Sequence, residues 1–121
     1  MTKKIVTLAG DGIGPEIMAA GLQVLAAVAP KINFEYEVEA KHFGGAAIDA
    51  EGHPLPEATL TAAKAADAIL LAAIGGPQYN DAAVRQEQGM LSLSKELGLL
   101  ANIQPVHMFE TLKHLSPQKP E

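Results

Sequence analysis

The chain has 121 residues, 48% of them apolar and 4% aromatic, which suits one small domain, or part of a larger one, with an aliphatic core. A net charge of −5 and scattered basic residues argue against a nucleic-acid binder, because neutralising phosphates requires clustered Lys and Arg. The lack of cysteine excludes disulfides and thiolate metal sites, and the longest apolar run, 68–74, is too short to cross a membrane.

The amino-terminal segment resembles no targeting sequence. It contains two lysines, but the apolar run at 5–9 is shorter than the apolar region of a secretory signal peptide. We therefore expect a cytoplasmic protein with neither a membrane nor a nucleic acid as partner.

The first predicted elements are a strand over 5–9, a glycine-rich loop over 10–14 and a helix that starts at Pro15. Proline suits the first turn of a helix, where its missing N–H would have no partner in any case. Pro30 is predicted to end this helix. Four apolar residues are spaced to share one helical face, namely Met18, Leu22, Leu25 and Ala29.

A second strand is predicted over 33–40, because apolar and acidic residues alternate there. Phe34, Tyr36 and Val38 fall on one side of this strand. Glu35, Glu37 and Glu39 fall on the other. Three glutamates can suggest a metal site, but the strict alternation favours a solvated strand face.

A loop over 41–56 precedes a predicted helix over 57–66 and a strand over 68–74. The strand is apolar throughout and is therefore expected to be fully buried. Within the loop, Asp49, Glu51 and His53 are close in sequence, but a turn with polar surface side chains explains them better than a metal site. His42, His107 and His114 have no partner at ligand spacing and are expected at the surface or at an interface.

The remaining predicted elements are a turn-rich loop over 75–81, a helix over 86–97 that stops at Gly98, an edge strand over 101–106, and one or two helical turns over 107–115. Strands that alternate with helices indicate an α/β fold with a mostly parallel sheet. Ligands of such sheets bind beyond the carboxyl ends of the strands. Both glycine loops, 10–14 and 75–76, are expected at these ends.

The loop at 10–14 resembles a nucleotide-binding motif only in part. Gly10 and Gly12 match the first two glycines of the dinucleotide fingerprint, but Pro15 stands at the third position. The pattern leaves two interpretations, a tight strand-to-helix turn whose glycines supply positive φ, or a pyrophosphate cradle. The turn is the better supported of the two.

Several longer stretches resemble the β-decarboxylating dehydrogenase family, of the isocitrate/isopropylmalate dehydrogenase type. The stretches are LAGDGIGPEI (8–17), FGGAAIDAEGHPLPEAT (43–59), ADAILLAAIGGPQYN (66–80), VRQEQGMLSLSKELGLLANIQPV (84–106) and LKHLSPQKPE (112–121). Together they are most similar to the amino-terminal third of the isopropylmalate dehydrogenases. The family binds NAD without a Rossmann fold, so the resemblance implies an isopropylmalate-dehydrogenase-like sheet with flanking helices.

The resemblance implies an NAD-dependent oxidation and decarboxylation of a 2-hydroxy acid, with Mg²⁺ or Mn²⁺ as Lewis acid, in leucine biosynthesis. The family's NAD loop matches 75–87 here, so the implied cofactor-binding residues are Gly75, Gly76, Pro77, Gln78 and Glu87. Met90 and Leu91 match positions that hold the substrate's isopropyl group. Taken alone, their spacing is equally that of an ordinary helix core.

Two positions depart from the family pattern. Ser94 and Gln104 stand where the family has arginines that hold the substrate's carboxylates. Neither residue offers the permanent charge and paired donors of a guanidinium. The departures favour a chain that is inactive alone, as a non-catalytic truncated remnant or as an interaction module that pairs with another chain.

The resemblance places the family's catalytic tyrosine and lysine and its metal-binding aspartates beyond residue 121, so it assigns no catalytic and no metal-binding residue to this sequence. Residues 1–100 match the amino-terminal part of the first domain, and 101–121 match the start of the crossing into the second. An incomplete, truncated sheet leaves edges and apolar faces uncovered. We therefore expect a homo-oligomer or a complementing chain as partner.

Overall fold

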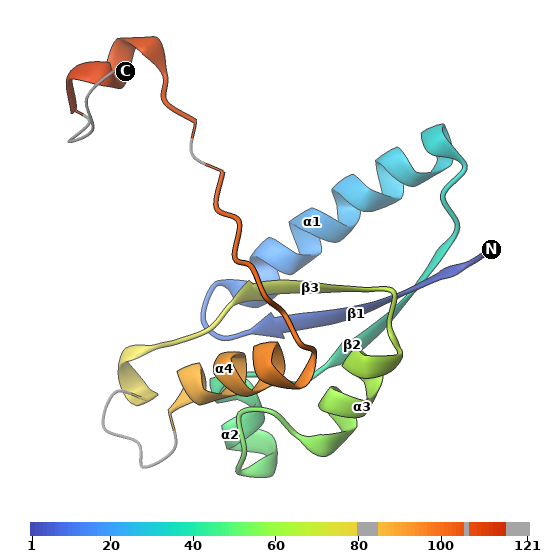
Figure 1. The fold of residues 1–121 in the computed structure, drawn as a ribbon, viewed down its shortest axis with the longest axis vertical. Helices are drawn as coiled ribbons and strands as arrows, with labels where there is room; N and C mark the ends of the chain where they lie inside the picture. The colour runs from blue at the N-terminus through green and yellow to red at the C-terminus, as the bar shows by residue number, and fades with distance from the viewer. Residues whose placement is uncertain (80–84, 106, 116–121) are drawn as a thin grey trace.

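A computed structural model describes residues 1–79, 85–105 and 107–115 (Figure 1). Its longer elements are, in chain order, β1 (Lys3–Gly10), α1 (Gly14–Val28), β2 (Tyr36–Lys41), α2 (Gly45–Glu51), α3 (Glu57–Ala65), β3 (Ala68–Ala73) and α4 (Gln86–Glu96). Short 3₁₀ helices cover Ala29–Ile32, Pro77–Tyr79 and Glu110–Leu115. Strands and helices alternate as the sequence predicts as far as α4, except that two helices, α2 and α3, lie between β2 and β3.

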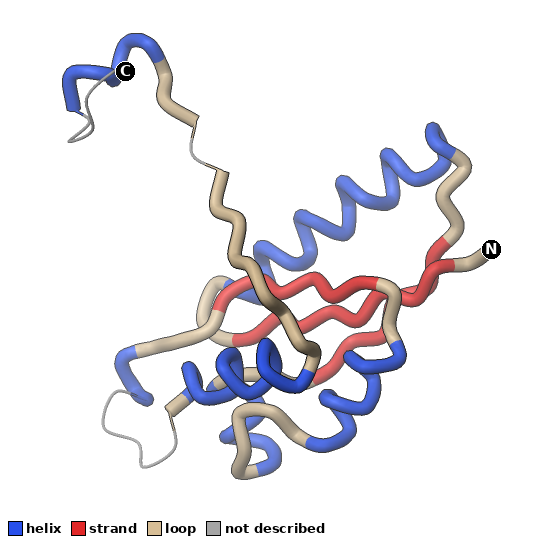
Figure 2. Tube along the Cα trace, in the orientation of Figure 1, coloured by secondary structure: helices blue, strands red, loops and turns tan. Residues whose placement is uncertain are grey.

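The strands form a parallel sheet in the order β2-β1-β3 (Figure 2). Ile5 in the central strand is level with Val38 of β2 and Ala68 of β3. Helix α1 packs on one face of β1, beside Thr7, while α3 and α4 pack against the face that carries Val6 and Leu8. The predicted α/β class, with a mostly parallel sheet and flanking helices, is confirmed.

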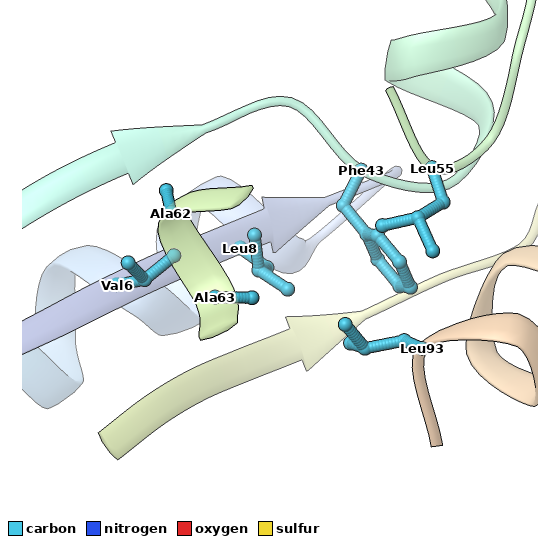
Figure 3. Packing of buried hydrophobic residues seen from close by; sticks show 7 residues of the cluster. All are labelled: Val6, Leu8, Phe43, Leu55, Ala62, Ala63 and Leu93. Carbon is cyan, nitrogen blue, oxygen red and sulfur yellow. The ribbon is translucent and has the colours of Figure 1, made fainter. Parts of the chain in front are cut away.

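The core lies between the sheet and the pair α3 and α4. Its buried members are Val6, Leu8, Phe43, Leu55, Ala62, Ala63 and Leu93. Figure 3 shows the fully buried Phe43 ring, from the segment after β2, directed toward Leu93 of α4. Burying each of the larger side chains stabilises the fold by about 1.5–3 kcal/mol. This core therefore attaches the β2–α2 segment and α4 to the central strand.

The sheet-facing side of α1 agrees with the predicted face. Met18 and Ala29 are buried, and Leu22 and Leu25 are half-buried. Pro30 ends the α-helix, but the chain continues as a 3₁₀ helix to Ile32 and then turns at Asn33, whose φ is 52°. Proline is compatible with this first turn because its N–H is not needed there.

Strand β3 contradicts the prediction of a fully buried strand over 68–74. It ends at Ala73, and its residues alternate between exposed and half-buried positions before becoming half-buried throughout. Among the described residues it is an edge strand, with β1 on one side only. A continuous apolar run shows only that the residues of a strand are hydrophobic. How far the strand is buried depends on its position in the sheet.

Two further predictions are wrong. The segment 41–56 contains the helix α2 rather than loop alone. Residues 101–105 form no strand, and all five are exposed. They run away from the sheet (Figure 1), so no neighbouring strand supplies their hydrogen bonds. Residue 106, which completes the predicted strand, lies outside the described residues.

In the described part of the chain, no helix has both the length and the apolar character needed to cross a membrane.

Candidate cofactor and substrate site

Asp11, directly after β1, is the centre of the hydrogen-bond network at the carboxyl ends of the strands. Its Oδ2 accepts the backbone N–H groups of Gly45 at 2.8 Å and Gly75 at 2.9 Å. Its Oδ1 accepts the N–H of Ala46 at 2.6 Å. Its own N–H donates to the Ala73 carbonyl at 2.8 Å. One buried carboxylate therefore joins the glycine loop after β1, the first turn of α2 and the loop after β3.

The glycines around Asp11 allow the backbone segments to approach closely. Gly10 has a φ of +71°, and a Cβ there would overlap the Ala73 carbonyl oxygen. A Cβ on Gly14 would overlap the Ala9 carbonyl oxygen. The Asp11 carboxylate stands in this loop and already binds the amides of Gly45, Ala46 and Gly75, which are therefore not available to a pyrophosphate. The structure supports the strand-to-helix turn and gives no support to the cradle.

The predicted cofactor loop follows β3 at the same end of the sheet. Gly75 has a φ of 111°, a conformation that favours glycine, and both Gly75 and Gly76 are half-buried. Pro77–Tyr79 form a 3₁₀ turn in which the Tyr79 N–H donates to the Gly76 carbonyl at 3.0 Å. The backbone of Gln78 lies inside this turn. The loop is therefore ordered by its own hydrogen bonds and by Asp11.

Glu87, the other residue implied for the cofactor, lies in the first turn of α4 and is exposed. A carboxylate is favourable there because the amino-terminal end of a helix carries partial positive charge. The chain between the 3₁₀ turn and Arg85 lies outside the described residues.

A groove of about 410 Å³ contains part of the predicted substrate site. Its lining is Met90, Ser94, Leu99, Leu100, Ala101, Asn102 and Ile103. Leu91 is 72% exposed and lies outside this lining, as does the exposed Gln104. Met90 and Ser94 are thus brought together, whereas Leu91 and Gln104 are not. No charged side chain lines the groove in the described part of the chain, so nothing there pairs with a carboxylate.

Three of the residues weighed as metal ligands, Asp49, His53 and Glu39, have other contacts. Asp49 accepts the Tyr79 hydroxyl at 2.6 Å, and His53 Nδ1 lies 2.8 Å from the Leu55 carbonyl. Glu39 pairs with Lys4 and Lys41, each at 2.8 Å, and these hydrogen bonds lower its pKa to about 2. Across the described ranges, no group of three or more His, Asp or Glu is placed to hold a metal ion. No step through a metal is therefore assigned to these residues.

Sequence reasoning missed two residues of this site, Asp11 and Tyr79. The only sequence feature that marked Asp11 was its place between two glycines, Gly10 and Gly12. Tyr79 follows the glycines of the predicted cofactor loop, and its ring packs where a Gly45 side chain would lie. Neither contact could be located from spacing, because the partners are 30 or more residues away.

Residues 4–121 match the family model described as isocitrate/isopropylmalate dehydrogenase. The chain belongs to this family. The resemblance drawn from the sequence stretches is thereby confirmed, and so is the fold that it implied.

Curated relatives in this family are closely similar over the whole chain. It is 74% identical over 121 residues to the 3-isopropylmalate dehydrogenase of Streptococcus thermophilus (strain CNRZ 1066). This match covers all of this chain and 35% of that protein. It is 71% identical over 117 residues to the 3-isopropylmalate dehydrogenase of Lactococcus lactis subsp. lactis (strain IL1403), covering 97% of this chain and 34% of that protein. The chain spans about a third of the length of the relatives that it matches.

Solved structures agree with the family. A β-decarboxylating dehydrogenase from Thermococcus kodakarensis, in its apo form, superposes with a TM-score of 0.64 and 31% identity over 80% of this chain and 27% of that chain. An isocitrate dehydrogenase from Methylococcus capsulatus superposes with a TM-score of 0.55 and 32% identity over 62% of this chain and 21% of that chain.

Proposed function

We propose that residues 1–121 provide the cofactor loop and one wall of the substrate pocket of a 3-isopropylmalate dehydrogenase. The whole enzyme would carry out the NAD-dependent oxidative decarboxylation of 3-isopropylmalate in leucine biosynthesis, in the cytoplasm. The observation that carries this proposal is the 74% identity, over all 121 residues, to an enzyme of that name.

The geometry of the loop after β3 supports cofactor binding. Gly75 and Gly76 lie at the carboxyl end of a parallel strand, where ligands of such sheets bind. With no side chains, they let a ligand approach the backbone closely. When bound, NAD would accept a hydride from the substrate. The contribution of Gly75, Gly76, Pro77 and Gln78 would be to shape the surface on which it lies, with Glu87 near the nicotinamide.

The groove beside α4 supports binding of the substrate's alkyl group. Met90 and the apolar residues at 99–101 and 103 would enclose a branched alkyl chain, and each buried CH₂ contributes about 0.8 kcal/mol. Leu91, beside Met90 in α4, is a further candidate for this contact.

Two positions, Ser94 in this groove and Gln104 outside its lining, support the proposal that this chain is inactive alone. Ser94 and Gln104 replace the two arginines expected from the family, and the charge-assisted hydrogen bonds of an arginine contribute about 1.5–3 kcal/mol each. Losing both corresponds to binding weaker by roughly 10²–10⁴-fold, at about 1.4 kcal/mol per tenfold. The side chains that would hold the divalent metal and those that would transfer protons would have to come from further polypeptide.

The test joins residues 1–121 to the remaining two thirds of the Streptococcus thermophilus relative. NADH formation is measured with 3-isopropylmalate, NAD and Mg²⁺. We expect strong turnover only when Ser94→Arg and Gln104→Arg are both present, and no turnover from residues 1–121 alone. Strong turnover of the unrepaired fusion would show that the two arginines are dispensable.

A non-catalytic interaction module is the second candidate. The observation that favours it is that, among the described residues, the lining of the groove that contains Ser94 carries no charged side chain. If the doubly repaired fusion binds NAD but still fails to turn over the substrate, this second function is the better account.

A further inference from the structure

A hydrogen bond between two side chains joins the cofactor loop to α2. The Tyr79 hydroxyl, at the end of the 3₁₀ turn after β3, donates to Asp49 Oδ2 at 2.6 Å. The Tyr79 ring is buried and packs on Gly45, where any side chain on Gly45 would overlap it. The loop is therefore held at its far end by Tyr79, while Asp11 holds its near end through the Gly75 N–H.

Asp49 is poorly placed for helix stability. It lies in the second half of the seven-residue helix α2, near the end that carries partial negative charge. Aspartate also has a low helix propensity. The energetics of the helix alone therefore favour Ala at this exposed position. The hydrogen bond with Tyr79 is the contribution of Asp49 that offsets this cost.

We propose that Tyr79 and Asp49 are positioning residues that latch the cofactor loop onto α2 before any nucleotide binds. This inference rests on the proposed function for the choice of nucleotide, but not for the latch itself. The latch holds Gly75 and Gly76 in one conformation, so binding need not order them. Ordering a loop on binding lowers affinity, and a loop that is already ordered avoids that loss.

The first test measures hydrogen exchange of backbone amides in residues 1–121. The informative amides are those of Gly75 and Tyr79, which donate to Asp11 and to Gly76. We expect Tyr79→Phe and Asp49→Ala each to raise exchange at both amides about tenfold. Asp49→Asn keeps an acceptor oxygen, so it should restore slow exchange.

Tyr36→Phe is the matched control, because Tyr36 stacks on Phe34 at the opposite end of the sheet, with ring centroids 5.8 Å apart. It should leave the amides of Gly75 and Tyr79 unchanged. If Tyr79→Phe does not fold, the comparison of Asp49→Ala with Asp49→Asn still tests the proposal. Equal exchange in the wild type and in Asp49→Ala would overturn the latch.

The second test measures NAD binding by calorimetry with the same variants, placed in the fusion of residues 1–121 to the rest of the relative. We expect Asp49→Ala to weaken the affinity about tenfold and Asp49→Asn to leave it nearly unchanged. If this fusion binds no NAD while residues 1–121 show the exchange pattern, the proposed function of the loop is refuted and the latch is retained. A chain that binds NAD equally in all variants would overturn the latch as a positioning device.

Discussion

At the scale of single residues, the site depends on a carboxylate, Asp11, whose partners are backbone amides. Asp11 is 5% exposed and accepts three N–H groups from two different segments. The sequence predicted the glycines around it correctly as a turn, but it gave no reason to choose Asp11 as the residue that joins the segments. Its role follows from where α2 and β3 lie.

Asp11→Ala is expected to lower the free energy of unfolding by about 3 kcal/mol, because one buried and two half-buried N–H groups would lose their acceptor. The measurement is urea denaturation followed by circular dichroism. Asp67→Ala is the matched control. Asp67 accepts hydrogen bonds from Lys3 and from the Lys4 N–H at an exposed position, so its loss should be about 1 kcal/mol or less. Equal losses would contradict the central role of Asp11.

Glu39 predicts a small acid dependence of stability. Hydrogen bonds from Lys4 and Lys41 lower its pKa from 4.5 to about 2. As the pH falls, the Glu39 carboxylate is therefore protonated first in the unfolded chain. The contribution of Glu39 to the free energy of unfolding is complete above pH 4.5 and is lost as the pH falls to about 2. Glu39→Gln should remove this part of the dependence. The measurement is the free energy of unfolding of the wild type and of Glu39→Gln as a function of pH. Parallel curves for these two proteins would contradict the prediction.

At the scale of elements, α1 carries apolar residues on two sides. The predicted side packs on the sheet, but Ile13, Ile17, Val24 and Val28 form a second stripe that is exposed in the described structure. Helical periodicity identified the first stripe because its residues lie at 3.6-residue spacing. The same periodicity cannot tell which of two apolar stripes faces the sheet. That choice depends on the fit of side chains such as Met18 against Thr7.

Substitutions on the two sides of α1 should differ in effect. Val24 is 64% exposed, so Val24→Glu should change the free energy of unfolding by no more than about 0.5 kcal/mol. Met18 is buried, so Met18→Ala should cost about 2 kcal/mol or more. Thermal or urea denaturation of both variants measures the difference. A large loss for Val24→Glu would show that its side of α1 is covered in solution.

Helix α2 shows why one element was missed. Gly44 and Gly45 are typical of a loop, and α2 has only seven residues, a length at which an isolated helix is unstable. Its first N–H groups are bound by Asp11, which lies 34 and 35 residues earlier in the chain. The helix is therefore stabilised by a tertiary contact that local sequence patterns do not contain.

At the scale of the whole molecule, the structure has a compact body and an exposed segment after α4. Residues 99–105 are exposed throughout, and the chain leads away from the sheet toward the 3₁₀ helix Glu110–Leu115 (Figure 1). The division at residue 100 into a first domain and a crossing segment stays a prediction, as does association with another copy or a complementing chain.

Limited digestion with chymotrypsin should separate these two parts. Leu100 is fully exposed and Phe109 is 71% exposed, whereas Phe43 is fully buried. We expect the first cuts after Leu100 and Phe109, with cleavage after Phe43 only once the body unfolds. Mass spectrometry of early time points gives the order. Simultaneous cleavage at Phe43 and Phe109 would show that the body is not stably folded by itself.

By itself the sequence determined the α/β class, the approximate bounds of β1, α1, α3 and α4, the turn made by the glycines after β1, and the family. These features depend on patterns within a few neighbouring residues, or on long stretches shared with relatives. The tertiary structure alone decided the helix α2, the exposed edge of β3, the extended chain at 101–105 and the roles of Asp11 and Tyr79. Each of these depends on whether a segment distant in sequence supplies a hydrogen bond or a packing surface. Such segments come together only in the folded chain.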